Sequence, residues 1–116
     1  MACIFCSIIN KEIPKDPQEI VFEDSEFIAF HDLHPKAPFH ALIVPKVHIA
    51  SVQDLKEGEE ELTGRMIGLA KNIAAENKLE GYKLIFNVGP KGGQMIAHLH
   101  LHLVGGWESS PGKVEV

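Results

Sequence analysis

The clearest pattern of apolar and polar positions lies at residues 97–106, AHLHLHLVGG, where histidine and leucine alternate strictly. Successive side chains of a β-strand point to opposite faces of the sheet, whereas a helix would scatter them. The alternation therefore predicts a strand in which His98, His100 and His102 share one face and three leucines share the other. At a rise of about 3.3 Å per residue, neighbouring histidines would stand roughly 6.6 Å apart. Two neighbours could converge on one small target, but all three could not easily bind one metal ion.

Four other segments carry the pattern of strands. EIVFEDSEFIAFHD predicts a hairpin with strands over residues 20–22 and 27–30. The two prolines of PKAPFH interrupt regular structure and predict a rigid exposed loop, after which HALIVPK resumes as a strand that Pro45 ends. YKLIFNVG predicts a fourth strand over 82–89, and PKGGQ connects it to the histidine strand as the fifth.

Between the third and fourth predicted strands the apolar period changes to that of a helix. The positions that recur at helical spacing are Leu62, Met66, Leu69, Ala70 and Ile73. They predict one amphipathic helix from about Glu59 to Asn77, and Gly81 fits the stop after it. The expected architecture is an α+β fold, an antiparallel sheet of about five strands with one main helix, in a single domain over residues 1–116.

Composition narrows the classes of partner. A chain of 116 residues with 45% hydrophobic and 23% charged residues is an ordinary globular protein that can bury a core. Its 11 basic and 16 acidic residues leave a net charge of −5, the wrong sign for gripping a nucleic-acid backbone, so no nucleic-acid partner is expected. No stretch approaches the roughly 18 apolar residues of a membrane span, and no secretory signal is recognisable at residue 1. We expect a cytoplasmic protein without a membrane partner.

The loop GPKGGQ, residues 89–94, places three glycines beside the predicted histidine face. Consecutive N–H groups in such a loop can form an anion-binding nest, although many hairpins use Gly-Gly merely to turn. Beside histidines that can donate hydrogen bonds, a phosphate is the natural ligand. A neutral imidazole is a competent nucleophile near pH 7 and can form a covalent nucleotidyl intermediate. No D-x-D or similar acidic cluster lies nearby to hold Mg²⁺, so we expect no catalytic metal.

Several motifs occur in a characteristic order along the chain: CIFCSIINKEIP, FIAFHDLHPKAPFHALIVPKVHI, FNVGPKGGQ and HLHLHLV. They resemble the amino-terminal segment, central block, active-site hairpin and His-x-His-x-His-x-x motif of the histidine-triad nucleotide-binding proteins, specifically their Hint branch of nucleoside phosphoramidases. The resemblance covers nearly the whole chain. It implies a histidine-triad fold with a short N-terminal helix, and hydrolysis of the P–N bond of purine nucleoside 5′-phosphoramidates through a nucleotidyl-histidine intermediate. It also implies a two-fold homodimer that joins two sheets and uses the long helix.

The resemblance also implies roles for individual residues. His100 matches the nucleophile and His102 the histidine that bonds the phosphate. Asn87 matches the asparagine that contacts the phosphate or its bridging atom, and Asp32 matches the acidic residue that accepts hydrogen bonds from both ribose hydroxyls. The other implied nucleotide contacts are Phe5, Ile8, Phe30, His31, Leu33, Gly93, Gln94 and Met95. The alternative for the base-pocket positions, Phe5 and Ile8 above all, is ordinary core packing.

Cys3 and Cys6 form a C-x-x-C pair, which in a reducing compartment favours a metal or redox motif over a structural disulfide. Two further ligands are needed to complete a tetrahedral Zn²⁺ site, and the resemblance points to His48 and His98. Structural zinc on His98 would leave the other two histidines of the triad free for catalysis. The alternative is a pair of empty buried thiols, since many Hint relatives lack the second cysteine.

The chain departs from the Hint pattern in two places. Met95 stands where many relatives place a serine that touches the phosphate or the leaving group, and a thioether cannot donate a proton. We therefore expect activity to depend more steeply on leaving-group basicity than in those relatives. The segment after Gly106 is expected to reshape the leaving-group side through Trp107. His34, in a proline-rich loop, and His40, before a strand, are not expected to be catalytic.

Other functions stay open at this point. The runner-up within the same fold is a dinucleoside polyphosphate hydrolase. A nucleotide-binding or scaffold protein with little turnover and a small zinc protein belong to different classes, and turnover of a nucleoside phosphoramidate separates them from the enzymes.

Overall fold

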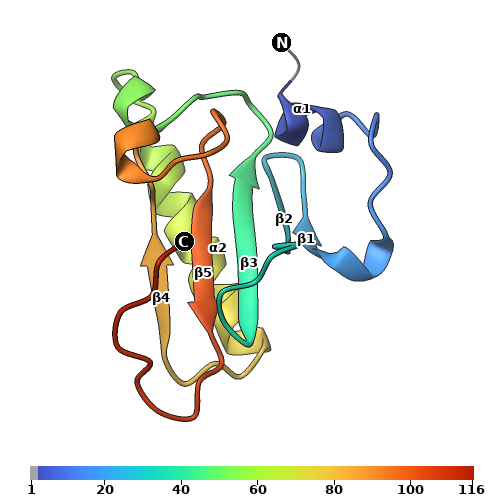
Figure 1. Ribbon diagram of the computed structural model, residues 1–116. Helices are drawn as coiled ribbons and strands as arrows, with labels where there is room; N and C mark the ends of the chain where they lie inside the picture. Colours follow the sequence, from blue (N-terminus) through green and yellow to red (C-terminus); the bar gives the residue numbers. More distant parts are fainter. Residues whose placement is uncertain (1–2) are drawn as a thin grey trace.

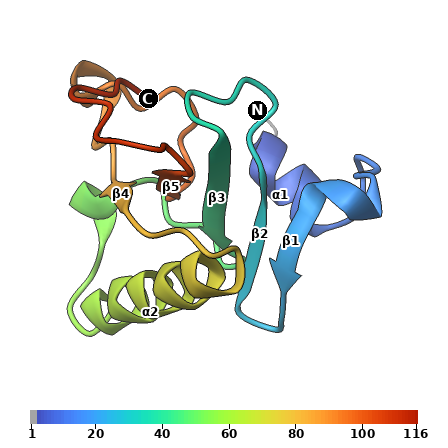
Figure 2. The ribbon, with the colours of Figure 1, turned by 90° about the horizontal axis from the view of Figure 1, so that it is seen from below.

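The computed structural model describes residues 3–116 and has an α+β architecture (Figure 1). Its antiparallel sheet has five strands in the order β1-β2-β3-β5-β4, and the main helix α2 covers one face of it (Figure 2). The helices and strands are α1 (Ile4–Ile9), β1 (Ile20–Glu23), β2 (Phe27–His31), β3 (Phe39–Pro45), α2 (Glu60–Glu76), β4 (Tyr82–Ile85) and β5 (Leu101–Gly105). Short 3₁₀ helices lie at Pro17–Glu19, Val52–Asp54 and Pro90–Gly92. The predicted fold class, including the short N-terminal helix, is confirmed. Within residues 3–116 no helix combines the length and apolar character needed to cross a membrane.

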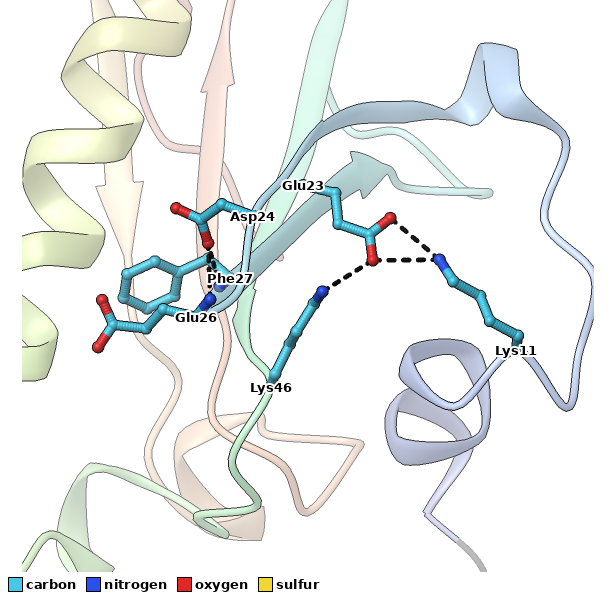
Figure 3. A network of polar contacts seen from close by, with 6 residues as sticks. All are labelled: Lys11, Glu23, Asp24, Glu26, Phe27 and Lys46. Carbon is cyan, nitrogen blue, oxygen red and sulfur yellow. Dashed lines mark hydrogen bonds and ion pairs between the residues drawn. The ribbon is translucent and has the colours of Figure 1, made fainter.

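The β1–β2 hairpin is closed by a single carboxylate. Asp24 Oδ1 accepts hydrogen bonds from the main-chain N–H of Phe27 at 2.7 Å and of Glu26 at 2.8 Å (Figure 3). These donors, that of Phe27 first, hold the pKa of Asp24 below its usual value. An aspartate that bonds its own backbone two or three residues on is a standard reason for a turn. The hairpin therefore forms where the sequence predicts it.

The two faces of the sheet bury different sets of side chains. The alternating residues of each strand divide between them, as the pleat requires. One face packs against α2, and its core contains Phe27, Ala29, Ile43, Leu62, Met66, Ala70, Ile73, Leu99, Leu101 and Leu103. The other face packs against α1 through Phe5, Ile8, Ile28, Phe30, Leu42 and Val44. Because the leucines of the alternating motif pack with α2, its histidines face the side that α1 covers.

The histidine strand is shorter than predicted. β5 begins at Leu101, so the first two histidines of the triad precede it, and the expectation of one strand over 97–106 is wrong for that part. In the β3–β5 ladder the last pair is Ile43 with Leu101. Before that pair the N–H of Leu99 donates to the carbonyl of Ile49, a residue that follows β3, and not to a residue of β3. The chain before Leu101 is therefore held by a residue outside the ladder.

β4 also ends early, at Ile85, four residues before the predicted end. Beyond it the chain is held by side chains instead of a ladder. The Asn87 side-chain amide donates to the carbonyl of Gly92 at 2.9 Å, and the N–H of Gly89 donates to Gln94 Oε1 at 2.9 Å. Residues 86–89 thus belong to the glycine loop and not to the sheet.

Candidate active site

The three histidines of the motif are buried together on the α1 side of the sheet. Their exposed fractions are 0% for His98, 8% for His100 and 7% for His102. The rings of His100 and His102 lie 5.0 Å apart between centroids, close enough to act on one group. Phe5 of α1 packs edge-on against the rings of both His98 and His100, at 5.8 Å and 5.2 Å. The structure therefore places α1 directly against the predicted nucleophile.

The hydrogen bonding of His100 fixes which of its nitrogens is free. His100 Nδ1 lies 2.7 Å from the main-chain oxygen of His98. A carbonyl oxygen can only accept, so Nδ1 carries the proton and donates it. Burial lowers the pKa of His100, which keeps the ring neutral. Nε2 of a neutral imidazole in this tautomer bears the free electron pair that a nucleophile needs.

His102 is oriented by a chain of hydrogen bonds that begins at the backbone. The N–H of Lys36 donates to His40 Nδ1 at 3.0 Å, so the proton of neutral His40 is on Nε2. His40 Nε2 lies 2.9 Å from His102 Nδ1 and donates to it, which leaves the proton of His102 on its own Nε2. Burial, then the neighbouring His100 and His40, lower the pKa of His102 to about 4. His102 is therefore a neutral hydrogen-bond donor.

Sequence reasoning missed the second contact of His40. The expectation that His40 supports the loop before its strand agrees with the Lys36 bond, but the same ring also sets the tautomer of His102. Asp32 Oδ2 lies 3.5 Å from His40 Nε2, so the predicted ribose acceptor belongs to this cluster. The sequence offered one signal, the alternation of His40 and Leu42 along β3. That signal indicates a contact with His102 only when the β3–β5 register, which places Leu42 opposite His102, is also given.

A cavity of about 480 Å³ opens over this cluster. Asp32, His34, Lys36, His40 and His102 form one side of its lining. Gly93, Met95, Ile96 and Val116 supply the rest. Met95 lines the cavity and is 95% exposed, and its contact with the leaving group stays a prediction.

The segment after Gly106 reaches the cavity by a different residue from the one predicted. Trp107 lines a separate surface cavity with Tyr82 and Lys83 of β4, so the expectation for Trp107 is wrong. Lys83 Nζ contacts the main-chain oxygen of Gly112, which holds the segment against β4. Val116 then lies beside the site, where nothing in the sequence indicated it.

The predicted base-pocket residues fall into two groups. Phe5, Ile8 and Phe30 are 3%, 7% and 3% exposed and pack together in the core under α1, as the core-packing alternative expected. Phe5 also packs edge-on against the ring of His100, the predicted nucleophile. The ring of His31 packs against Phe39, and Leu33, next to Asp32, is 70% exposed. Leu33 is therefore available to a ligand without any rearrangement.

The glycine loop does not form the predicted anion nest. The N–H groups of Gly92 and Gln94 donate to the carbonyl of Gly89, and that of Gly93 donates to Pro90. These three N–H groups are hydrogen-bonded inside the loop, so the prediction that they bind an anion is wrong. The side chain of Gln94 connects the loop to neighbouring segments. Its amide nitrogen donates to the carbonyls of Ala50 and Ile96, and its oxygen accepts from the N–H of Gly89.

Asn87 lies against this loop with one unused polar atom. Its amide nitrogen donates to the Gly92 carbonyl, which fixes the orientation of the side chain. Its Oδ1 is buried and finds no partner among residues 3–116. A β-carbon added to Gly93 would lie 3.2 Å from the Asn87 amide nitrogen, so glycine is required for this close approach, and its φ of +90° favours glycine as well.

The two cysteines lie close to two histidines beside α1. The ligand atoms of Cys3, Cys6, His48 and His98 all lie within 4.8 Å of one another. His98 Nδ1 lies 3.3 Å from Cys3 Sγ and 3.1 Å from His48 Nδ1, and Cys6 Sγ lies 3.3 Å from His48 Nδ1. His98 Nε2 donates to the Pro45 carbonyl at 2.8 Å, so its Nδ1 is unprotonated and aimed at the cluster. The set of two sulfurs and two nitrogens suits tetrahedral Zn²⁺.

Comparisons with known proteins match the chain over most of its length. A family model described as "Scavenger mRNA decapping enzyme C-term binding" matches residues 2–115. The chain is 43% identical over 110 residues to a purine nucleoside phosphoramidase of Escherichia coli (strain K12), covering 93% of this chain and 90% of that protein. A crystal structure of a HIT family hydrolase from Legionella pneumophila superposes with a TM-score of 0.87 at 42% identity, covering 96% and 98% of the two chains. A zinc-bound histidine-triad protein from Mycobacterium smegmatis superposes with a TM-score of 0.81 at 27% identity, covering 96% of this chain and 79% of that chain.

Proposed function

We propose that this chain, which belongs to the Hint-like branch of the histidine-triad family, hydrolyses the P–N bond of purine nucleoside 5′-phosphoramidates. The observation that carries the proposal is the pair of fixed tautomers. His100 presents a free electron pair on Nε2, and His102 beside it presents an N–H. A nucleophile next to a hydrogen-bond donor is the pairing that attack on an anionic phosphoryl group requires.

In this reaction His100 Nε2 attacks phosphorus and the P–N bond breaks. The electron pair of that bond leaves with the amine, which takes up a proton from solvent, and a nucleotidyl-histidine forms. Water then releases the nucleoside monophosphate and restores the histidine. His102 donates to a phosphate oxygen, Asp32 accepts from the ribose hydroxyls, and Asn87 Oδ1 accepts from the N–H of the bridging nitrogen. The exposed Leu33 contacts the base, and the buried Phe5 packs against the ring of His100.

The decisive experiment compares two substrates. A fluorogenic adenosine 5′-phosphoramidate is expected to turn over at least about tenfold faster, in kcat/KM, than a diadenosine polyphosphate, a difference of about 1.4 kcal/mol. Fluorescence and chromatography of the nucleotide product measure the two rates. A faster dinucleotide reaction would establish the runner-up activity, and nucleotide binding without turnover of either would establish a binding protein.

We further propose that Cys3, Cys6, His48 and His98 hold a structural zinc ion. The four ligand atoms already converge, and the bond from His98 to the Pro45 carbonyl supplies the outer partner that metal-bound histidines usually have. Purified protein is expected to carry about one zinc per chain. Cys6→Ser is expected to lower the melting temperature by several degrees while changing kcat less than threefold. Elemental analysis and thermal melts measure both, and protein prepared without chelators that contains no zinc would support the empty-thiol alternative.

We also propose a two-fold homodimer through β4 and α2. β4 is an edge strand of the described sheet, and edge strands with apolar side chains invite pairing. Tyr82, Leu84 and, on α2, Ile67 are 38%, 37% and 46% exposed. Light scattering at micromolar concentration is expected to give twice the chain mass, and Leu84→Lys is expected to shift it toward the monomer. A monomer mass for the unmodified protein would exclude the dimer.

A further inference from the structure

We propose that a groove between the β1–β2 hairpin and α2 is a docking site for an extended protein segment in which lysine or arginine flanks an apolar side chain. The groove has a volume of about 460 Å³ and is lined by residues from the ranges 22–27 and 65–76. It lies on the α2 face of the sheet, whereas the histidines of the triad lie on the other face. The proposal is therefore independent of the reaction at His100.

The groove is at the opposite end of the sheet from β4. β1 is one edge of the described sheet and β4 is the other. The β1–β2 turn lies beside α2 (Figure 2), and Arg65 of α2 binds Glu26 of the turn. The homodimer proposed above uses β4 and Ile67, and Ile67 does not line the groove. A second copy bound in that way would leave the groove free for another partner.

The floor of the groove is apolar. Phe27 and Ile73 belong to the buried core under α2. Phe22 and Leu69 pack against that core while staying partly exposed. Burial of apolar surface is favourable in proportion to its area. An aromatic or aliphatic side chain of a partner would therefore be stabilised over Phe22 and Leu69.

Gly68 keeps the α2 wall of the groove open. It lies inside α2, where glycine weakens a helix relative to alanine. A β-carbon added to Gly68 would meet nothing within 4 Å. No contact among residues 3–116 therefore requires glycine here, and the missing side chain leaves room for one from a partner.

The rim of the groove carries negative charge that the chain does not neutralise. Glu26 is paired, because Arg65 donates to its two oxygens at 2.9 Å and 2.7 Å. Neither Asp24 nor Glu76 forms an ion pair within residues 3–116. Two unpaired carboxylates thus border an apolar floor. This arrangement complements a segment with cationic side chains and repels an acidic one.

At Glu23, on the other side of the same hairpin, the charge is neutralised. Glu23 binds Lys46 at 2.9 Å and Lys11 at 3.0 Å, away from Asp24 and Glu26 (Figure 3). These two lysines, Lys46 first, hold the pKa of Glu23 below its usual value. The charge available to a partner therefore lies on the groove side of the hairpin, and Glu23 provides a matched control.

The length of the groove favours an extended segment. From Arg65 to Glu76 its wall follows about three turns of α2, roughly 16 Å. An extended chain covers this length with roughly five residues. Every second side chain of such a chain faces the same way. An apolar residue over the floor would thus have a basic residue on either side of it at the charged rim.

The test measures the binding of a fluorescein-labelled peptide, Gly-Lys-Ser-Phe-Ser-Lys-Gly, by fluorescence anisotropy at low salt. Its phenylalanine and both lysines face the same side when the peptide is extended. We expect a Kd below about 1 mM, and binding at least about tenfold weaker when glutamate replaces both lysines or serine replaces phenylalanine. A lysine peptide that does not bind at about 1 mM, or a glutamate peptide that binds equally well, would overturn the proposal.

Two pairs of variants test whether the peptide lies in the groove. Gly68→Leu fills the groove and should weaken binding at least about tenfold, whereas Gly64→Leu makes the same change on α2 outside the groove and should change it less than about twofold. Leucine favours a helix more than glycine does, so both variants should melt no lower than the unmodified protein. Glu76→Gln should weaken binding about threefold, and Glu23→Gln should not.

Equal effects within either pair would overturn the proposal, because binding would then not depend on the groove or on its free charge. Displacement of the peptide by AMP would place it at the histidine cavity and would overturn the proposal as well.

Discussion

His100→Ala is expected to lower the turnover of an adenosine phosphoramidate by at least about 10³-fold while leaving the affinity for AMP within about threefold. The reason is that the hydrogen bonds of the triad leave the electron pair of His100 Nε2 free, whereas the electron pair of His98 Nδ1 faces the cysteines. Binding persists because Asp32, His102 and the loop that carries Gly93 stay in place. Single-turnover kinetics and calorimetric titration with AMP measure the two quantities.

Two measurements separate a missing nucleophile from a damaged fold. A rapid acid quench of the unmodified protein should trap a chain heavier by one nucleotidyl group, and the variant should show none. His100→Asn replaces the ring with a side chain that can still donate to the His98 carbonyl, so it should keep the melting temperature and still lose turnover. Wild-type turnover in either variant would move the nucleophile to another residue.

The strands that could be predicted are those whose signals are local. The alternation of histidine and leucine assigns the leucines to the α2 face, and the structure confirms this because Leu99, Leu101 and Leu103 lie in that core. The start of β5 could not be predicted, since it depends on where its pairing with β3 begins. The N–H of Leu99 bonds to the carbonyl of Ile49, which is distant in the sequence, and no local pattern shows such a bond.

The candidate site divides in the same way. The metal cluster could be proposed from the sequence, because the resemblance supplied His48 and His98 and the structure brings both to the cysteines. The Gly-rich loop was misjudged because composition does not reveal that its amides bond to each other within a 3₁₀ turn. Val116 reaches the cavity through the path of the segment that Lys83 holds, and no local pattern encodes such a path.

The last expected result concerns His40, the histidine that the sequence did not assign to the chemistry. His40→Leu removes the N–H that His102 Nδ1 accepts, so His102 is free to hold its proton on Nδ1 and lose the donor at Nε2. We expect kcat to fall roughly 10²-fold, the size typical of losing one hydrogen-bond donor to an oxygen that gains charge in the transition state, with a smaller change in KM. Steady-state kinetics with the adenosine phosphoramidate measure both parameters.

His40→Gln is the matched variant, because its side-chain amide can donate from nearly the position of the imidazole Nε2. It should recover most of the lost kcat, whereas leucine fills the space without donating. A leucine variant that melts like the unmodified protein and keeps its kcat would show that the tautomer of His102 does not depend on His40. Equal losses in the leucine and glutamine variants would assign the effect to packing beside Asp32 and not to the hydrogen bond.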